Sequence, residues 1–430
     1  MERRAAHFRV GRTAAGRCGK LRTVNAAPSI APDCVGERID RATRLLLLAL
    51  AASLPLSIAA AQVFAYPAVA LWVVRCARRR FAGWWRHPFA RPVTMFALAA
   101  VAASAFGVRP SHALLKCHRL LLFGLIFAAA GAGGADVAAR RTFAARLVLA
   151  FAAGTSALAV YDLVRIPIGL QAGRSLIDLG NMRDPQFFMT ALLLLLPGAA
   201  ALPAAVRRWR WAGLLLAAGG LVWHFKRGAW AAFAVGATVL AAGTRRWRIL
   251  LAVGAAALAL LALPPTRERL SQLREEWMLA SGGRATMWLR IAPGIIPDHP
   301  WGMGLGAVRN EDLVRYGPTA DAKHNHLHNN ALQIALELGF PGLAIWLGWM
   351  AVAIAVWVRA ARAAARANDP ARRALAVGGL SAFCALLADG MVEYNFGDNE
   401  ILMLFSLLMG LAALLARSDA PAGAGAGAAP

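Results

Sequence analysis

Twelve apolar runs, most of them followed by a polar stretch, restrict the folds open to this 430-residue chain more than any other feature. Crossing a bilayer as a helix takes about 20 apolar residues, and the shorter runs need tilt or a thin bilayer. The runs lie at about residues 45–60, 61–74, 93–107, 113–130, 143–160, 187–204, 211–223, 229–242, 249–263, 343–358, 374–388 and 401–415. The sequence therefore predicts an all-α, polytopic integral membrane protein with about twelve transmembrane helices.

Composition agrees with a membrane protein. Hydrophobic residues make up 59% of the chain and charged residues 16%, which is not the balance of a soluble protein of this length. The formal net charge of +25 would indicate nucleic-acid binding in a soluble chain. Most arginines stand between apolar runs, however, so they indicate topology and contact with anionic membrane lipids, and we predict no nucleic-acid partner. The five cysteines follow no metal or redox motif.

The arginine clusters also predict the orientation of the chain. Counting runs from a cytoplasmic N-terminus places every cluster on the same side of the membrane. The clusters are Arg75–Arg91, Arg140–Arg146, Arg207–Arg210, Arg245–Arg248 and Arg359–Arg373. Because Lys and Arg are enriched in cytoplasmic loops, both termini are expected in the cytoplasm, and the remaining loops face the other side.

Five segments follow from these patterns. Residues 1–43 are basic and reach an apolar run too late for a cleaved signal peptide, so they predict a disordered cytoplasmic tail or a start codon assigned too early. Residues 264–328 contain helical patterns and predict a folded periplasmic cap. The other segments are residues 44–263 with transmembrane helices 1–9, residues 329–416 with a helix at the periplasmic face and transmembrane helices 10–12, and residues 417–430 with a disordered cytoplasmic tail.

One polar cluster stands directly before an apolar segment. Residues 324–330 contain three histidines and three asparagines, and polar groups at such a depth usually line a cavity or a site. His328 titrates near neutral pH in its ordinary state and is the candidate general base. Its alternative role is to cap a helix. Asn329 and Gln333 are candidate partners for sugar hydroxyls, or ordinary residues of a helix start.

Basic residues on the outer side contradict the topological trend and therefore suggest a function. Arg227 and Lys226 lie in a very short loop, and Arg183 and Arg284 lie in two further outer loops. A guanidinium group stays charged and forks onto phosphate oxygens, so the set predicts a clamp for a lipid diphosphate. The alternative is snorkelling to headgroups or pairing with nearby acids such as Glu393.

Two further patterns bear on this site. His324 and His328 stand four residues apart and would suit a metal ion completed by Asp298 or His299, but no standard zinc spacing is present, and we predict no metal or other cofactor. The acidic residues Asp389, Glu393, Asp398 and Glu400 are expected to orient His328, pair with the arginines, or supply the base themselves. Gly302, Gly304 and Gly306 predict a tight turn that returns the outer segment to the membrane.

Several of these stretches, in this order, resemble the O-antigen ligase and polymerase superfamily. The stretches are Lys226–Trp230, Arg284–Trp288, His299–Gly302 with Gly304 and Gly306, His328–Gly342 and Tyr394–Glu400. They cover about the second half of the chain, and the first half resembles the family only as a series of spans. One departure is Lys226, where many relatives have a small hydroxyl residue.

The resemblance implies a metal-independent glycosyltransferase of the multi-span type in a bacterial inner membrane, with its active site facing the periplasm. It implies a glycan on undecaprenyl diphosphate as donor and, in a ligase, the lipid A core oligosaccharide as acceptor. By position, Arg227 and Arg284 would bind the diphosphate and His328 would be the catalytic base. The alternatives are an O-antigen polymerase, with a second lipid-linked glycan as acceptor, a protein O-oligosaccharyltransferase, and a membrane transporter, for which the chain lacks a convincing internal repeat.

Overall fold

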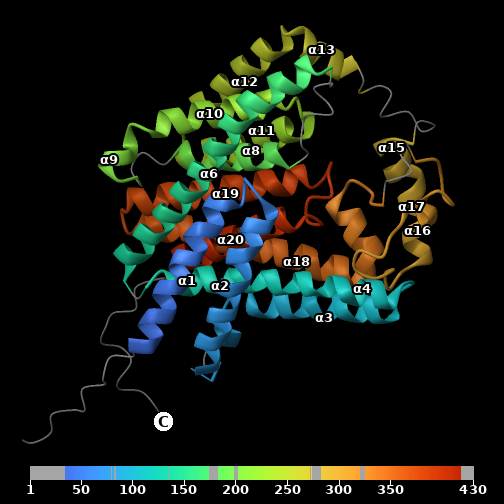
Figure 1. Ribbon diagram of the computed structural model, residues 1–430, viewed down its shortest axis with the longest axis horizontal. Helices are drawn as coiled ribbons and strands as arrows, with labels where there is room; N and C mark the ends of the chain where they lie inside the picture. Colours follow the sequence, from blue (N-terminus) through green and yellow to red (C-terminus); the bar gives the residue numbers. More distant parts are fainter. Residues whose placement is uncertain are drawn as a thin grey trace, which may run out of the picture.

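The protein is described here by a computed structural model, and almost all of its regular structure is helical (Figure 1). The described residues are 34–417, except residues 79, 82–83, 135, 174–182, 198–201, 272, 274–281 and 320–324. Within these ranges there is no β-strand, which confirms the all-α prediction. His324 and the greater part of both predicted tails lie outside the described residues.

The first half of the chain forms paired helices. They are α1 (Cys34–Ser53), α2 (Ile58–Arg78), the 3₁₀ helix η1 (Trp84–Arg86), α3 (Ala90–Phe106), α4 (Pro110–Lys116), η2 (Cys117–Phe123), α5 (Gly124–Ala132), α6 (Val137–Gln171), α8 (Asp184–Leu195), α9 (Ala204–Arg207) and α10 (Arg210–Trp223). Because α1 begins at Cys34, residues 34–43 are helical and the predicted tail with its boundary at residue 43 is too long.

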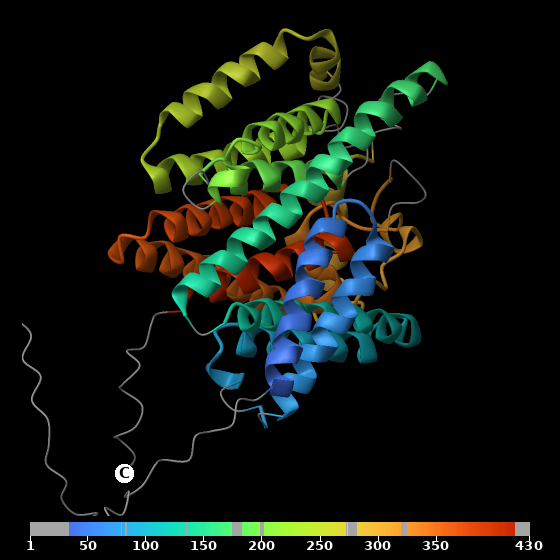
Figure 2. The same ribbon diagram turned by 60° about the vertical axis from the view of Figure 1, so that its left-hand side comes forward.

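The second half supplies the centre of the bundle and an outer segment. Its elements are α11 (Arg227–Thr244), α12 (Arg248–Leu261), α13 (Pro264–Ser271), α15 (Arg284–Thr286), the π-helical turn η4 (Met287–Ile291), α16 (Ala292–Asp298), α17 (Asn310–Leu313), α18 (Asn330–Arg366), α19 (Pro370–Asp389) and α20 (Asn399–Ala416). In both views α10, α11 and α12 lie on one side of α19 and α20, whereas α3 and α4 lie on the other side, beyond α18 (Figures 1 and 2).

Helix α20 forms the core of the bundle because it is apolar on every side. Nearly all of its residues are buried, and it packs against α5, α18 and α19. A helix that is apolar all round belongs in the centre of a large protein or a membrane bundle. Figure 2 shows that the long α6 crosses the outside of this core.

The predicted apolar runs overlap helices, but the number of spans is not confirmed. Six described helical segments are long and apolar enough to cross a membrane by length and composition. They are Ile58–Arg78, Pro110–Ala132, Val137–Gln171, Asn330–Arg366, Pro370–Asp389 and Asn399–Ala416. Four further apolar helices are shorter, at 10–17 residues. The structure therefore supports an integral membrane protein without supporting the count of twelve.

The outer segment before α18 has a hydrophobic core of its own. Met287, Ile291, Ile295, Leu313 and Leu327 are buried in this second cluster, which packs against the start of α18. Figure 1 shows α15, α16 and α17 grouped beside that end of α18. The part of residues 264–328 that forms this cluster is therefore folded.

A glycine turn fixes this segment to α18, as the sequence predicted. Gly302, Gly304 and Gly306 all have positive φ angles, of 92°, 104° and 63°. The Gly304 amide donates to the Glu337 carbonyl at 2.9 Å, and the Phe340 amide donates to the Pro300 carbonyl at 3.0 Å. These two bonds flank a break in α18, where Gly339 has φ 71° and ψ −177°. The piece of α18 before Gly339 is thereby held against the outer segment.

We expect Gly339→Ala to destabilise the protein. A Cβ atom at this position would lie 2.3 Å from the Pro300 carbonyl oxygen, and the positive φ disfavours alanine independently of space. Backbone strain of this kind costs about 1–3 kcal/mol, to which the clash adds. The measurement is the thermal unfolding midpoint of the purified protein in detergent. Gly348→Ala is the matched control, because an added Cβ there meets nothing within 4 Å. Equal midpoints for the two variants would contradict this account of the break.

Candidate functional site

The candidate site is centred on a histidine–carboxylate pair. His328 Nδ1 lies 2.9 Å from a carboxylate oxygen of Glu393, which follows α19. Both side chains are largely buried, with 12% and 15% of their surface exposed. A carboxylate bonded to one imidazole nitrogen fixes the ring orientation and selects the tautomer in which the other nitrogen accepts a proton. The pair therefore has the arrangement of an oriented general base.

His328 precedes the helix rather than lying on its face. Asn329 is the N-cap of α18, and its side-chain oxygen accepts a hydrogen bond from the Leu332 amide at 3.1 Å. The Asn329 side-chain nitrogen donates to the Met391 carbonyl at 2.8 Å, which ties the cap to the loop that carries Glu393. His328 itself has φ 48°, a left-handed conformation that non-glycine residues rarely adopt and that is frequent at functional sites.

The loop between α19 and α20 is held by a buried amide network. The Asn330 side chain donates to the Asn395 side-chain oxygen at 2.7 Å and accepts from the Phe396 amide at 3.0 Å. The Asn330 backbone amide donates to the Gly390 carbonyl at 2.7 Å. Since buried amides without partners would be costly, this network fixes the loop relative to the start of α18. Glu393 is thereby placed beside His328.

Arg284 approaches Glu393 from the opposite side. Its Nε donates to the Val392 carbonyl at 2.9 Å, and a terminal nitrogen lies 3.4 Å from Glu393 Oε2. Glu393 therefore lies between an imidazole and a guanidinium group. Burial would raise the pKa of Glu393, but the hydrogen bond and charge of His328 and the charge of Arg284 lower it to about 2. Glu393 is consequently a carboxylate at neutral pH.

The turn that carries Lys226 and Arg227 adjoins the same loop. Arg227 is the first residue of α11, and Lys226 is its N-cap. A Cβ atom at Gly228 would lie 2.9 Å from a Val392 methyl group, so the turn packs directly on Val392. The chain thus brings the start of α11, the residues around Arg284 and His328 around a single loop.

Other predicted site residues have different surroundings. Arg183 pairs with Glu400 at the first turn of α20. Gln333 is fully buried, accepts from the Leu327 amide at 2.9 Å and donates to Glu337 at 2.8 Å. A buried amide engaged in this way holds the backbone before His328, so the structure gives Gln333 a supporting role instead of the predicted sugar contact. Asn329, as the N-cap, has the helix-start role that the sequence left open.

A second cluster behind the Lys226–Arg227 turn was not predicted. His224 Nε2 lies 3.0 Å from Asp162 Oδ2 in α6, and Arg165 donates to the other oxygen of Asp162 at 2.8 Å. Asp184 of α8 is buried beside this pair, and the three residues offer ligand atoms within 4.8 Å of one another. In the sequence, this cluster is indicated by Asp162, a charged residue at the end of an apolar run. The cluster connects the end of α10 to α6 and so supports the turn that follows.

The histidine cluster offers three donor groups to a cation. His326, His328 and Glu393 have ligand atoms within 4.8 Å of one another, and the rings of the two histidines are 4.2 Å apart. The sequence paired His328 with His324, which lies outside the described residues. Asp298, considered as a further ligand, instead accepts a hydrogen bond from the Tyr316 hydroxyl at 2.5 Å.

Comparison with known proteins identifies the part of the chain that carries Arg227, Arg284 and His328. Residues 212–347 match the family described as O-antigen ligase. No curated protein matches the chain. The matched residues extend from α10 through the outer segment to the membrane part of α18, and the Glu393 loop follows them. Residues 212–347 are thus similar to the O-antigen ligase family, which supports the resemblance that the sequence motifs indicated.

Proposed function

We propose that the protein is an O-antigen ligase that transfers a glycan from undecaprenyl diphosphate to a sugar hydroxyl of the lipid A core oligosaccharide. The observation that carries the proposal is the convergence of three elements on one loop. His328 and Arg284 both contact Glu393, and the Arg227 turn packs on the neighbouring Val392. A base and two guanidinium groups are the parts that a glycosyl transfer from a lipid diphosphate requires.

The reaction is a single displacement. His328 removes the proton from the acceptor hydroxyl through the nitrogen that does not face Glu393. The hydroxyl oxygen then bonds to the anomeric carbon, while the bond from that carbon to the diphosphate oxygen breaks. The electron pair leaves with the diphosphate, and Arg227 and Arg284 stabilise the added negative charge. Attack opposite to the leaving group inverts the anomeric configuration.

Further residues assist this centre. Glu393 keeps its negative charge and stabilises the imidazolium that forms on His328, as its low pKa of about 2 indicates. Lys226, at the start of α11, adds positive charge for the incoming lipid diphosphate. Arg183, at the start of α8, can assist only where the diphosphate competes with its partner Glu400. The arginine clusters at the opposite helix ends orient this centre toward the periplasm of a bacterial inner membrane.

A gene deletion distinguishes this ligase from a polymerase that uses the same donor. Loss of the ligase should leave a lipid A core without long O-antigen, while polymerised glycan accumulates on the lipid carrier. The measurement is the banding of lipopolysaccharide on a gel, together with the carrier-linked glycan fraction. Complementation with the wild-type gene is the control. A core that still carries single repeat units would show that chain extension was lost instead, and the chain would be a polymerase.

Chelation tests whether the guanidinium groups act without a metal. We expect transfer by the purified protein to survive EDTA, and His326→Ala to retain most activity, because Arg227 and Arg284 supply the positive charge. The measurement is the initial transfer rate with and without the chelator. His118→Ala, at an exposed histidine remote in sequence, is the control for His326→Ala. Loss of activity on chelation that a divalent ion restores would instead assign a metal to His326, His328 and Glu393.

A further inference from the structure

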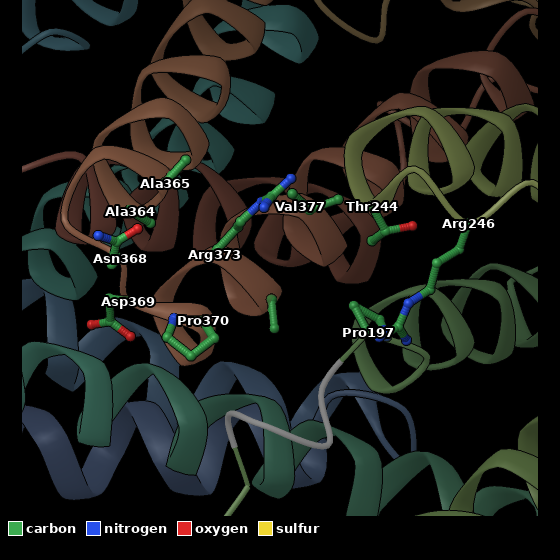
Figure 3. A pocket seen from close by; sticks show the side chains of 11 residues that line it. Pro197, Thr244, Arg246, Ala364, Ala365, Asn368, Asp369, Pro370, Arg373 and Val377 are labelled. Carbon is green, nitrogen blue, oxygen red and sulfur yellow. The ribbon is translucent and has the colours of Figure 1, made fainter.

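A second cavity lies at the opposite ends of the helices that carry the site. Helix α11 starts beside Val392 and ends at Thr244, and α19 starts at Pro370 and ends beside Glu393. The end of α11, the end of α18 and the start of α19 border an open cavity of about 420 Å³ (Figure 3). The cavity is therefore separated from the candidate site by the length of the bundle.

Two arginines from different elements line this cavity. Arg246 belongs to the turn between α11 and α12, and Arg373 to the first turns of α19; Figure 3 shows them on different sides of it. Arg373 donates to the Gly243 carbonyl at 3.1 Å, which fixes one end of its guanidinium group. The Arg246 side chain makes no hydrogen bond or ion pair with the described residues, whereas its backbone amide donates to the Ala241 carbonyl at 3.1 Å. Together they present several N–H donors to a ligand.

The acidic group in the lining does not cancel this charge. Asp369 is the N-cap of α19 and accepts from the Arg372 amide at 2.9 Å. Its carboxylate also lies 3.3 Å from a guanidinium nitrogen of Arg141 in α6. Because Asp369 is paired with Arg141, the cavity keeps the positive charge of Arg246 and Arg373. The remaining lining contains the polar residues Thr244 and Asn368 and an apolar part formed by Pro197, Ala364, Ala365, Pro370, Ala374 and Val377.

We propose that this cavity binds the phosphate of an anionic phospholipid headgroup. Two guanidinium groups can hold phosphate oxygens through charge-assisted hydrogen bonds, and the apolar wall suits the glycerol and the first carbons of the acyl chains. Basic pockets between transmembrane helices are established sites for anionic headgroups. A soluble phosphate compound offers the same anion without the apolar part. This inference concerns lipid binding and does not depend on the glycosyl transfer proposed above.

The test compares lipid binding by delipidated wild-type protein and two double variants. Arg246→Gln with Arg373→Gln removes both cavity arginines. Arg362→Gln with Arg366→Gln removes the same charge from exposed positions at the same end of α18 that do not line the cavity. The measurement is the apparent affinity for phosphatidylglycerol, from thermal unfolding and native mass spectrometry in detergent. Losing two charge-assisted contacts should weaken binding about tenfold or more in the cavity variant only.

Three results would overturn the proposal. The first is the same affinity for phosphatidylglycerol in the two double variants. The second is that phosphatidylcholine stabilises the wild type as much as phosphatidylglycerol does. The third is that inorganic phosphate or diphosphate binds as tightly as phosphatidylglycerol, which would assign the cavity to a soluble anion. The single variant Arg246→Gln covers the case in which loss of the Arg373–Gly243 bond prevents folding, because the Arg246 side chain makes no hydrogen bond or ion pair with the described residues. None of these measurements requires transferase activity. A failure of the lipid-binding proposal is therefore distinguished from a failure of the proposed glycosyl transfer.

Discussion

His328→Ala should lower the rate of glycan transfer by about a hundred- to ten-thousand-fold, the usual effect of losing a general base. The variant should still fold and bind the lipid-linked donor. The side chain of His328 bonds to Glu393, whereas the backbone around it is held separately by the Asn329 cap and by Gln333. The measurement is the transfer rate of purified protein at saturating donor, with donor binding measured on the same preparation.

Glu393 provides the decisive comparison for this assignment. A carboxylate with a pKa of about 2 is a poor proton acceptor at neutral pH, so its expected role is to orient His328 and stabilise the imidazolium. Glu393→Gln should therefore leave some His328-dependent transfer. If His328→Ala retained near-normal turnover while Glu393→Ala was inactive, the acidic loop would hold the base. Because the folded pKa lies below the ordinary 4.5, the stabilising effect of this charge is complete above pH 4.5 and is lost as pH falls through about 2.

Arg284→Lys and Arg227→Lys should each lower the transfer rate by about a hundredfold or more, although both keep the positive charge. Lysine cannot fork onto two phosphate oxygens, and at residue 284 it also cannot reproduce the Nε bond to the Val392 carbonyl together with the contact to Glu393. The measurement is the initial transfer rate of each purified variant, after a check that its thermal unfolding midpoint matches the wild type.

Two further arginines, one close to Arg284 and one at the other end of the helix that Arg227 begins, serve as matched controls. Arg290→Lys changes an exposed residue of the Arg284 segment, and Arg245→Lys changes an exposed residue at the other end of α11. Both variants should retain wild-type transfer rates. Full activity of Arg284→Lys and Arg227→Lys would show that a point charge suffices and that no bidentate phosphate contact is made at these positions.

The sequence by itself determined the helical character of the chain and the residue types of the site. Apolar runs must become helices in a membrane, because the backbone cannot leave its polar groups unpaired in lipid. The polar cluster at His328 and the arginines in the loops predicted to lie outside were recognisable because such residues are energetically costly near a membrane. The glycine pattern at residues 302–306 likewise predicted a turn from the conformational freedom of glycine alone.

Only the tertiary structure decided how these residues are used. The bonds of Glu393 to His328 and Arg284 join positions 65 and 109 residues apart, so no local pattern could select Glu393 among four nearby acids. Gln333 and Asn329 were candidate partners for sugar hydroxyls, but a buried amide must find hydrogen-bond partners within the fold. Gln333 bonds to the Leu327 amide and the Glu337 side chain, and Asn329 donates to the distant Met391 carbonyl. The His224–Asp162 pair and the break at Gly339 depend in the same way on packing between elements, since each is fixed by atoms that the local sequence does not contain.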